Sequence, residues 1–464
     1  MIERARLLNS RTPRTDARYV LYWSQINRRA ESNHALAFAA DLANQHGLPL
    51  LFYEGLTCSY PYASDRLHTF LLEGVPETAE CLRRAGIGYV FHLRRRRSDP
   101  DDALYRLAAD AAVIVTDDYP VFIMREYNRR VPGKVDIPYY VVDSSCVVPM
   151  AHFVKQEYAA YTIRPKIHKV LRECLKAVPP LRVRQGFQGM EHKEFHTEVT
   201  PENIASLVAG CEIDHSVPPS TAFRGGRREA VRLLRLFLKN NLRRYARDSR
   251  EPSAHATSGL SPYLHFGCIS SLEVALGVRD YALEHKLIVD EFLEQLIVRR
   301  ELAFNFAHFS PYLNSLEALP DWARASLAKH AADQRDPVYT LEQFERAETH
   351  DALWNATQTE LLVRGVIHGY YRMYWGKKIM EWSAGYGEAL ETMIRLNDRY
   401  ALDGRDPNSY ANILWCFGLH DRPWGERPVF GKIRSMTRAG MDRKTDVAGY
   451  IREIEGREQP GLFP

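Results

Sequence analysis

Short, mostly apolar segments alternate with amphipathic ones over the first third of the chain. Segments of this kind are typical of strands that are covered on both faces, and five of them occur, at residues 19–23 (YVLYW), 49–52 (PLLF), 88–93 (GYVFHL), 112–116 (AVIVT) and 138–142 (PYYVV). Between them lie stretches with helical spacing of apolar residues, such as residues 35–46. Strands that alternate with helices predict an α/β domain with a doubly wound parallel sheet over residues 1–150.

The pattern changes in the second half of the chain, where strand-like segments nearly disappear. Apolar residues recur at helical spacing through residues 227–244, 291–308, 351–370 and 371–383. Residues 227–464 are therefore predicted to form an all-α domain. Residues 178–226 are rich in proline, glycine and polar side chains, which favours a long connection, and we expect the link between the two domains at residues 151–226.

Composition and charge narrow the class of protein. The 464 residues suffice for two or three domains. The 62 basic and 58 acidic side chains nearly cancel, so a nucleic-acid partner would need a local basic patch. The seven cysteines are scattered without a CxxC pair, which argues against a disulfide framework, a zinc site or an iron–sulfur cluster. We predict no metal site.

The N-terminus is polar and basic, and no apolar run approaches the roughly 20 residues that a membrane span needs. We therefore expect a cytoplasmic protein that is not inserted in a membrane. Residues 224–250 hold ten basic and two acidic side chains, a run that could face nucleic-acid phosphates. The alternative, which the run alone favours, is a solvated helix face with Val231, Leu234, Leu238 and Leu242 turned inward.

Residues 257–262 (TSGLSP) carry signals for the start of a helix. Ser261 suits the N-cap and Pro262 the first helical position. Hydroxyl groups beside the free N–H groups of a helix start can bind a phosphate, because both the donors and the helix dipole favour an anion. Capping without any ligand explains the same residues.

Tryptophans are concentrated in the last part of the chain, where five of the seven occur: Trp354, Trp375, Trp382, Trp415 and Trp424. Trp375 and Trp382 are seven residues apart, which is about two helical turns and about 10 Å along one helix face. A file of easily oxidised indoles could carry an electron between a buried cofactor and the surface. Tryptophans also fill the core of any large helical domain, and spacing alone does not decide between the two interpretations.

A dense polar loop follows the tryptophan region. Residues 395–400 (RLNDRY) and 403–408 (DGRDPN) lie between two helical segments. Ordinary turn chemistry of Asp, Gly, Pro and Asn accounts for such a composition. The functional alternative is that an amide, a carboxylate and a guanidinium of this loop face the polar edge of a flat redox cofactor.

Taken together, these segments resemble the class II cyclobutane pyrimidine dimer photolyases over nearly the whole chain. The stretches that carry the resemblance are SNHALAFA from Ser32, EYAAYTIRPK from Glu157, LSPYLHFGCIS from Leu260, THDALWNATQTELL from Thr349, HGYYRMYWGKKIMEWS from His368, LNDRYALDGRDPNSYANILW from Leu396 and HDRPWGERPVFGKIRSM from His420. The resemblance implies an N-terminal α/β antenna domain and a C-terminal helical domain that binds FAD. It also suggests an antenna chromophore of the deazaflavin type.

The family's FAD-binding positions fall on nine residues of this sequence. The phosphate-binding region corresponds to Tyr245, Thr257, Ser258, Leu260 and Ser261. Arg372 and Asp403 match an ion pair beside the isoalloxazine ring, Asn397 matches the residue that faces the reactive ring nitrogen, and Arg405 belongs to the same polar loop. An amide at position 397 is expected to favour the reduced forms of the flavin.

Electron transfer and DNA binding are implied for a second set of residues. Trp382, Trp354 and Trp375 match the photoreduction chain, with Trp382 nearest the flavin. Met373 and Trp415 match positions that pack on a flipped-out dimer, whereas Trp424, Lys432 and Arg434 lie where a DNA surface is expected. The implied partner is double-stranded DNA that contains such a dimer, bound by a monomer. Excited, reduced FAD would give one electron to the dimer and recover it after the ring opens.

Two positions depart from the family pattern. Gln295 stands where a glutamate hydrogen-bonds the dimer, and Arg299 stands where some members place an aromatic residue against it. These departures leave a cryptochrome-like flavin photoreceptor as the alternative to a repair enzyme. A dark flavoprotein oxidoreductase ranks third, because the nicotinamide-binding glycine fingerprint is missing: Phe91 stands where its third glycine is required after Gly86 and Gly88.

Overall fold

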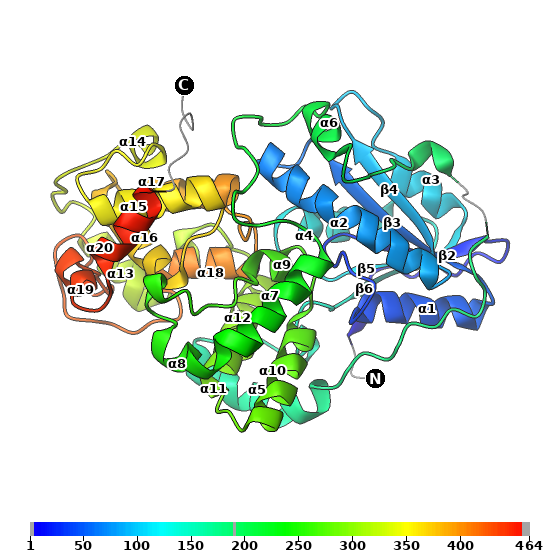
Figure 1. Ribbon diagram of the computed structural model, residues 1–464, viewed down its shortest axis with the longest axis horizontal. Helices are drawn as coiled ribbons and strands as arrows, with labels where there is room; N and C mark the ends of the chain where they lie inside the picture. Colours follow the sequence, from blue (N-terminus) through cyan, green and yellow to red (C-terminus); the bar gives the residue numbers. More distant parts are fainter. Residues whose placement is uncertain (1–3, 189–191, 457–464) are drawn as a thin grey trace.

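The computed structural model describes residues 4–188 and 192–456. An α/β domain and a helical domain lie side by side, with the N-terminal residues in the first and the C-terminal residues in the second (Figure 1). The predicted fold class is confirmed. Among the helices that the structure describes, none combines the length and the apolar character needed to cross a bilayer.

The sheet of the α/β domain has six strands in the order β1-β6-β5-β2-β3-β4. They are β1 (Ala5–Leu7), β2 (Tyr19–Ser24), β3 (Leu50–Thr57), β4 (Gly88–Arg94), β5 (Ala111–Asp117) and β6 (Tyr139–Val142). The five predicted strands are present and parallel, and β1 pairs antiparallel to β6 at one edge. Strand β1 was not predicted, because three residues of sequence ARL carry no periodic signal.

Helices cover both faces of this sheet, as a doubly wound sheet requires. They are α1 (His34–His46), α2 (Asp65–Arg84), α3 (Ala103–Ala109) and α4 (Phe122–Arg130). In β2, Val20 and Tyr22 pack into a cluster with residues of α1, whereas Leu21 and Trp23 pack on the other face with residues of α3. Every residue of β2 is buried, which explains why its sequence is a continuous apolar run.

The segment between the two domains contains two helices, α5 (Ala160–Cys174) and α6 (Ile204–Ala209). Helix α5 packs on the helical domain, next to a π-helical turn, η6 (Glu294–Arg299). Its residues Ile163 and Ile167 are fully buried in the core that the two domains share. The proposed limits of this linking region, residues 151–226, remain a prediction.

The second domain is helical throughout its described residues, as predicted. Its helices are α7 (Arg227–Asn240), α8 (Tyr245–Asp248), α9 (Ser261–His265), α10 (Ser271–His285), α11 (Asp290–Leu293), α12 (Arg300–Phe309), α13 (Asp321–Lys329), α14 (Leu341–Glu345), α15 (Ala352–Arg364), α16 (Gly369–Trp382), α17 (Tyr386–Tyr400), α18 (Pro407–Trp415), α19 (Arg438–Asp442) and α20 (Val447–Glu455). The predicted helix over 351–370 is too long, because Gly365 ends α15 in a left-handed conformation, with φ of 78°.

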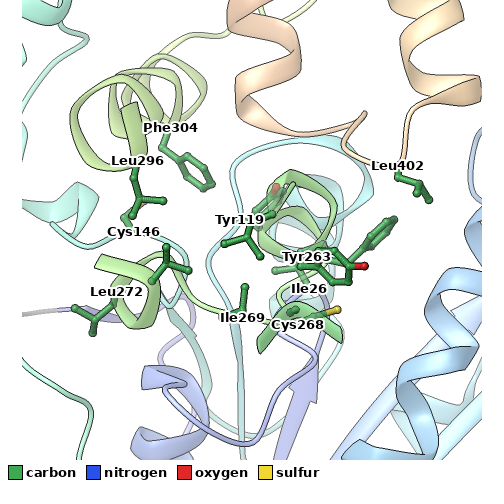
Figure 2. Packing of buried hydrophobic residues seen from close by; sticks show 14 of the residues in the cluster. Ile26, Tyr119, Cys146, Tyr263, Cys268, Ile269, Leu272, Leu296, Phe304 and Leu402 are labelled. Carbon is green, nitrogen blue, oxygen red and sulfur yellow. The ribbon is translucent and has the colours of Figure 1, made fainter. Parts of the chain in front are cut away.

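One apolar core joins the two domains. Ile26, Tyr119 and Cys146 from the first domain lie in the same buried cluster as Tyr263, Leu296 and Phe304 from the second (Figure 2). Because apolar surface of both domains is removed from water at this contact, separating them would expose much of one core. The domains therefore hold a fixed mutual arrangement.

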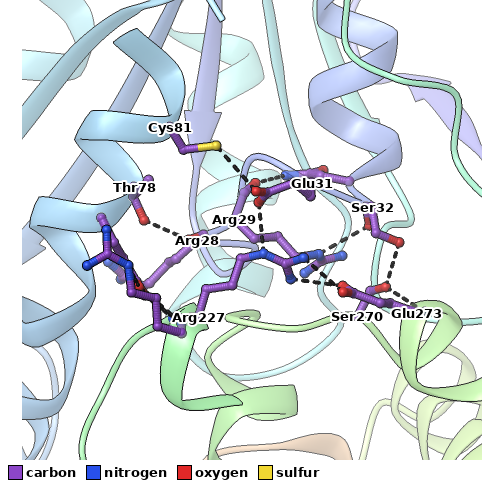
Figure 3. Close-up of polar contacts among 12 residues, drawn as sticks. Arg28, Arg29, Glu31, Ser32, Thr78, Cys81, Arg227, Ser270 and Glu273 are labelled. Atoms are coloured by element: carbon purple, nitrogen blue, oxygen red, sulfur yellow. Dashed lines mark hydrogen bonds and ion pairs between the residues drawn. The ribbon is translucent and has the colours of Figure 1, made fainter. Parts of the chain in front are cut away.

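Polar contacts complete the domain interface (Figure 3). Arg227 at the start of α7 binds Glu31 of the α/β domain at 2.9 Å and Glu273 of α10 with two hydrogen bonds of 2.9 and 2.8 Å. Ser32 Oγ lies 2.9 Å from Ser270 Oγ, and Arg29 donates to the carbonyl oxygen of Gly267 at 3.0 Å. These bonds fix the loop after β2 against α9 and α10.

Candidate functional site

An ion pair between α16 and the loop after α17 forms the centre of the candidate site. Arg372 Nη2 lies 2.8 Å from Asp403 Oδ1, although the two residues are 31 positions apart. The side chains are 19% and 10% exposed, so most of the pair is shielded from water. The structure thus brings together Arg372 and Asp403, which the family resemblance implied to form an ion pair.

Asn397 lies next to this pair, at the end of α17, and is buried. Its Nδ2 donates to Asp398 Oδ1 at 3.1 Å. The turn that carries Asp403 packs directly on the backbone of Asn397: a Cβ at Gly404 would lie 2.7 Å from the Asn397 carbonyl oxygen. Glycine is therefore required at position 404 for this close approach.

Arg405 follows Gly404 in a left-handed conformation, with φ of 58°. Such a conformation costs a non-glycine residue of order 1–3 kcal/mol and persists only where the surroundings enforce it. The guanidinium donates to the carbonyl oxygens of Asp398 and of Ala401, the latter at 2.9 Å. Arg405 also lines a cavity whose other lining residues come mostly from the α/β domain, so its side chain lies where the polar loop meets that domain.

The predicted phosphate-binding segment precedes α9. Leu260 is buried, Ser258 is half-buried, and Thr257 and Ser261 are exposed. The prediction that Ser261 caps the helix is wrong: the N-cap is Leu260, Ser261 is the first helical residue, and no side chain caps the helix. Gly259, with φ of 66°, turns the chain early enough for the helix to begin one residue sooner. Tyr245 lies in α8, with its ring 5.1 Å from that of Phe292.

The polar groups around Arg372 fit a ligand that accepts hydrogen bonds. Among residues 4–188 and 192–456, no hydrogen-bond partner is found for two buried atoms, Arg372 Nε and His368 Nε2. Gly369, between these residues, has no atom within 4 Å of the position where a Cβ would stand. Buried donors are normally satisfied. An isoalloxazine ring or a phosphate offers the acceptor atoms that these donors lack, so the residues present fit FAD.

The three tryptophans of the predicted electron chain are all buried. The rings of Trp354 and Trp382 are 6.4 Å apart between centroids. Trp354 Nε1 donates to the carbonyl oxygen of Trp375 at 3.0 Å, and Trp375 Nε1 donates to Gln358 Oε1 at 2.9 Å. The structure therefore brings these three residues into one connected group.

Met373 and Trp415, predicted to pack on a flipped dimer, are half-buried residues at the edge of the helical core. Lys377 Nζ lies 4.8 Å from the centre of the Trp415 ring and donates to the Cys416 carbonyl oxygen at 2.6 Å. Burial lowers the pKa of Lys377 to about 8. Lys377 was not identified from the sequence, where a lysine within an apolar helix face carries no distinguishing signal.

Gln295 and Arg299 lie on η6 and are both exposed. Arg299 Nε is 3.3 Å from Glu294 Oε1, and Glu294 also accepts two hydrogen bonds from Arg164, of 3.0 and 2.7 Å. These hydrogen bonds lower the pKa of Glu294. Arg299 thus shares one carboxylate with a second arginine, an arrangement that the sequence did not predict.

The predicted DNA surface lies in the loop after α18. Arg434 lies 4.9 Å from the ring centre of Trp424 and 5.8 Å from that of Trp415, while Arg422 lies 5.1 Å from Trp424. Trp424 is 39% exposed, and Lys432 is exposed. The structure therefore brings the loop residues together with Trp415 in one cationic and aromatic surface.

The basic run at residues 224–250 is partly neutralised by acidic neighbours. In addition to the contacts of Arg227, Arg228 lies 3.0 Å from Glu80 and Arg232 lies 2.5 Å from Glu229. Leu234 and Leu242 are buried, as the helix-face interpretation predicted. That interpretation accounts for most of this run.

A cavity opens at the carboxyl ends of β2 and β3. Its lining includes Arg28, Tyr53, Arg94 and Tyr127 from the α/β domain and His265, Phe266 and Arg405 from the helical domain. The neighbours of β2 are β3 on one side and β5 on the other, so the cavity lies where ligands bind in doubly wound sheets. That topological rule could have located this site, although of the lining residues named here only Arg405 was identified from the sequence, and for a role in FAD binding.

Three buried residues from separate segments meet between the two domains. Tyr119 donates to Asp406 Oδ2 at 2.6 Å, and His265 Nδ1 lies 3.2 Å from the same oxygen. Burial alone would raise the pKa of Asp406, but the contacts with His265 and Tyr119 hold it below its usual range. This contact links the α/β domain to α9 and to the polar loop, and no sequence motif predicts it.

The sequence is similar to known proteins along its whole length. Residues 20–183 match the model of the DNA photolyase family. The chain is 40% identical over 455 residues to a deoxyribodipyrimidine photo-lyase of Methanothermobacter thermautotrophicus, with 98% of each chain covered. It is 38% identical to a deoxyribodipyrimidine photo-lyase of Arabidopsis thaliana, over 94% of this chain and 88% of that one.

Solved structures show the same fold at lower sequence identity. The crystal structure of a cryptochrome from Synechocystis sp. PCC6803 superposes with a TM-score of 0.69 and 16% identity, over 94% of this chain and 88% of that chain. This likeness concerns the fold alone. From the long matches at 38% and 40% identity, the chain belongs to the photolyase and cryptochrome family.

Proposed function

We propose that this protein is a class II photolyase that repairs cyclobutane pyrimidine dimers in double-stranded DNA by using light. It is an enzyme of the deoxyribodipyrimidine photo-lyase type, like the relatives to which it is 36–40% identical. The observation that carries the proposal is the Arg372–Asp403 pair beside the buried Asn397. A paired charge and an amide next to unpartnered donors suit the polar edge of a flavin.

FAD would be bound by residues of both predicted regions. Thr257, Ser258 and Ser261 supply hydroxyl groups for its phosphates, while Arg372, Asp403 and Asn397 face the ring. When bound, FAD supplies a light-driven one-electron transfer to the dimer. The protein's own task is to hold the flipped dimer against Met373 and Trp415 and to exclude water there, since electrostatic interactions are strongest in a dry site.

The cavity in the α/β domain suits an antenna chromophore. Aromatic side chains such as Tyr53 and Tyr127 offer stacking surfaces, and Arg28 and Arg94 offer donors to the carbonyl or phosphate oxygens of a ligand. A deazaflavin would use both kinds of group. Because Arg405 lines the cavity and also belongs to the flavin loop, a chromophore there would lie close to the flavin, as energy transfer requires.

The second candidate function is a flavin photoreceptor with weak or absent repair. Gln295 and Arg299, the two departures from the photolyase pattern, are the observations that favour it. A light-dependent repair assay with a defined dimer in duplex DNA distinguishes the two functions. We expect about one FAD per chain on denaturation and loss of the dimer only under light. A folded monomer that takes up no FAD would exclude both functions, and FAD binding without repair would favour the photoreceptor.

Gln295 provides a graded test of the repair function. A neutral glutamine donates a hydrogen bond to a dimer carbonyl, whereas a glutamate carboxylate accepts a charge-assisted hydrogen bond from a ring N–H of the dimer, and such bonds are about twice as strong as neutral ones. We expect Gln295→Glu to strengthen binding of dimer-containing DNA by about 1 to 2 kcal/mol, or about tenfold. The measurement is the difference in Kd between dimer-containing and undamaged duplex, together with the repair rate under light.

Arg299→Ala should weaken the binding of dimer-containing DNA and slow repair, because it removes a cation from the surface next to Gln295. The fold should tolerate the change, since Glu294 keeps its two hydrogen bonds to Arg164. Arg279→Ala, which removes an exposed arginine paired with Asp280 on α10, serves as the matched control. If the natural protein does not distinguish damaged from undamaged duplex and Gln295→Glu changes nothing, the repair proposal fails.

A further inference from the structure

Asp398 follows Asn397 in the chain and contacts its side-chain amide. The hydrogen bond from Asn397 Nδ2 to Asp398 Oδ1 is 3.1 Å long, and both side chains are buried. An ionised carboxylate only accepts hydrogen bonds, whereas an amide has an N–H end and an oxygen end. The N–H end of Asn397 must therefore face Asp398, and the oxygen end is turned away from it.

Three elements hold the Asp398 carboxylate in place. Oδ1 accepts from Asn397 on α17 and from the backbone N–H of Arg405 in the following turn, the latter at 2.9 Å. Oδ2 accepts from the hydroxyl of Tyr410 on α18 at 3.0 Å. Burial raises the pKa of Asp398, and the charge of Arg405 and these hydrogen bonds oppose that effect. A carboxylate fixed from three sides can fix the orientation of a neighbouring amide.

We propose that Asp398 is a positioning residue that orients the Asn397 amide, oxygen outward, toward the flavin ring. The proposal rests on the proposed function, because it takes Asn397 as the residue that faces the ring. An outward amide oxygen accepts a hydrogen bond from a ring N–H, which the central ring of a flavin gains only on reduction. By holding the N–H end of Asn397, Asp398 therefore favours the reduced flavin over the oxidised one.

The test replaces Asp398 by asparagine in the FAD-loaded protein. An asparagine of the same shape can accept from Asn397 or donate to it, so the orientation of the amide is no longer fixed. At a fixed electrode potential, we expect the ratio of reduced to oxidised FAD to fall about tenfold. A factor of this size corresponds to the net free energy of one hydrogen bond. The readout is a spectroelectrochemical titration, which a loss of stability alone does not move.

A second readout does not need the cofactor. In protein without FAD, labelled with ¹⁵N at asparagine, the side-chain N–H of Asn397 should exchange slowly with solvent in the natural protein and rapidly in the Asp398→Asn variant. If the variant does not fold, the measurement on the natural protein alone still tests the proposal. Rapid exchange of both side-chain N–H groups of Asn397 in the natural protein would overturn it.

Two controls separate positioning from a general loss of structure. Asp143 is a buried carboxylate of the α/β domain that accepts hydrogen bonds from the backbone N–H groups of Ser145, Cys146 and Met150. Asp143→Asn should lower the melting temperature without changing the flavin ratio. In an Asn397→Ala background, Asp398→Asn should have no effect on that ratio.

The outcomes distinguish this inference from the proposed function. If the natural protein binds no FAD, the proposed function fails. If FAD binds and Asp398→Asn leaves the ratio unchanged, or shifts it equally in the Asn397→Ala background, only the positioning role of Asp398 is overturned.

Discussion

In a Trp382→Phe variant, we expect photoreduction of bound, oxidised FAD to slow by an order of magnitude or more. Phenylalanine is far harder to oxidise than indole, so the variant lacks the first donor of the predicted chain. The rings of Trp382 and Trp354 are 6.4 Å apart, so the substitution removes the indole that is predicted to lie between Trp354 and the flavin. The measurement is the bleaching of the oxidised FAD band under blue light with an external reductant.

The same variant should bind FAD normally and repair dimers once it has been reduced chemically. The reason is that the predicted role of Trp382 is to supply electrons to the flavin, whereas the dimer would receive its electron from the flavin directly. Trp322→Phe is the matched control, because Trp322 hydrogen-bonds Tyr158 and lies outside the tryptophan group. Equal photoreduction rates in the natural protein, Trp382→Phe and Trp322→Phe would show that the tryptophans only fill the core or that another electron-transfer path dominates.

The sheet and the helical character of the second domain were predictable because they depend on short-range patterns. The strand at residues 111–117 begins with five consecutive apolar residues, and all of its residues are buried. Boundaries that depend on one backbone conformation were less predictable. Gly365 ends α15 and Gly259 shifts the start of α9, and a glycine in a sequence does not reveal which sign of φ it adopts.

The candidate site was predictable where residues carry a family motif and not where it depends on tertiary contacts. The Arg372–Asp403 pair and the tryptophan group were named from the sequence, and the structure brings both sets together. The contact of Tyr119 with Asp406 joins residues 287 positions apart, and the cavity at the carboxyl ends of β2 and β3 is lined by residues of both domains. No local spacing encodes such contacts, because they arise only when the two domains pack.

The Arg372–Asp403 pair is predicted to connect the fold of the helical domain to cofactor binding. It links α16, which carries Trp375 and Trp382, to the turn whose Gly404 packs on Asn397. We therefore expect a change in this pair to affect both the Asn397 amide and the tryptophan group. For this reason, we expect its loss to affect FAD binding more than any other single ion pair of the helical domain.

In an Arg372→Ala variant, we expect FAD to bind about 30-fold more weakly, which corresponds to about 2 kcal/mol for a hydrogen bond between charged groups. Removing the guanidinium leaves the Asp403 carboxylate, 10% exposed, without its partner. A partly buried, uncompensated charge next to the ring disfavours both the folded loop and the bound cofactor. The measurement is the FAD Kd from quenching of flavin fluorescence, with the melting temperature of the cofactor-free protein recorded alongside.

Arg399 offers a matched control for this prediction. It pairs with Glu345 at 2.7 Å, and the two side chains are 20% and 17% exposed, close to the values for Arg372 and Asp403. Arg399→Ala should cost at least similar stability and leave the FAD Kd within about threefold of the natural value, because both of its carboxylate partners, Glu345 on α14 and Asp214 before α7, lie outside the flavin loop. If both variants weaken FAD binding equally, the effect of Arg372 is a general loss of structure. Selective weakening in Arg372→Ala, matched by Asp403→Asn, would instead show that the pair itself binds the cofactor.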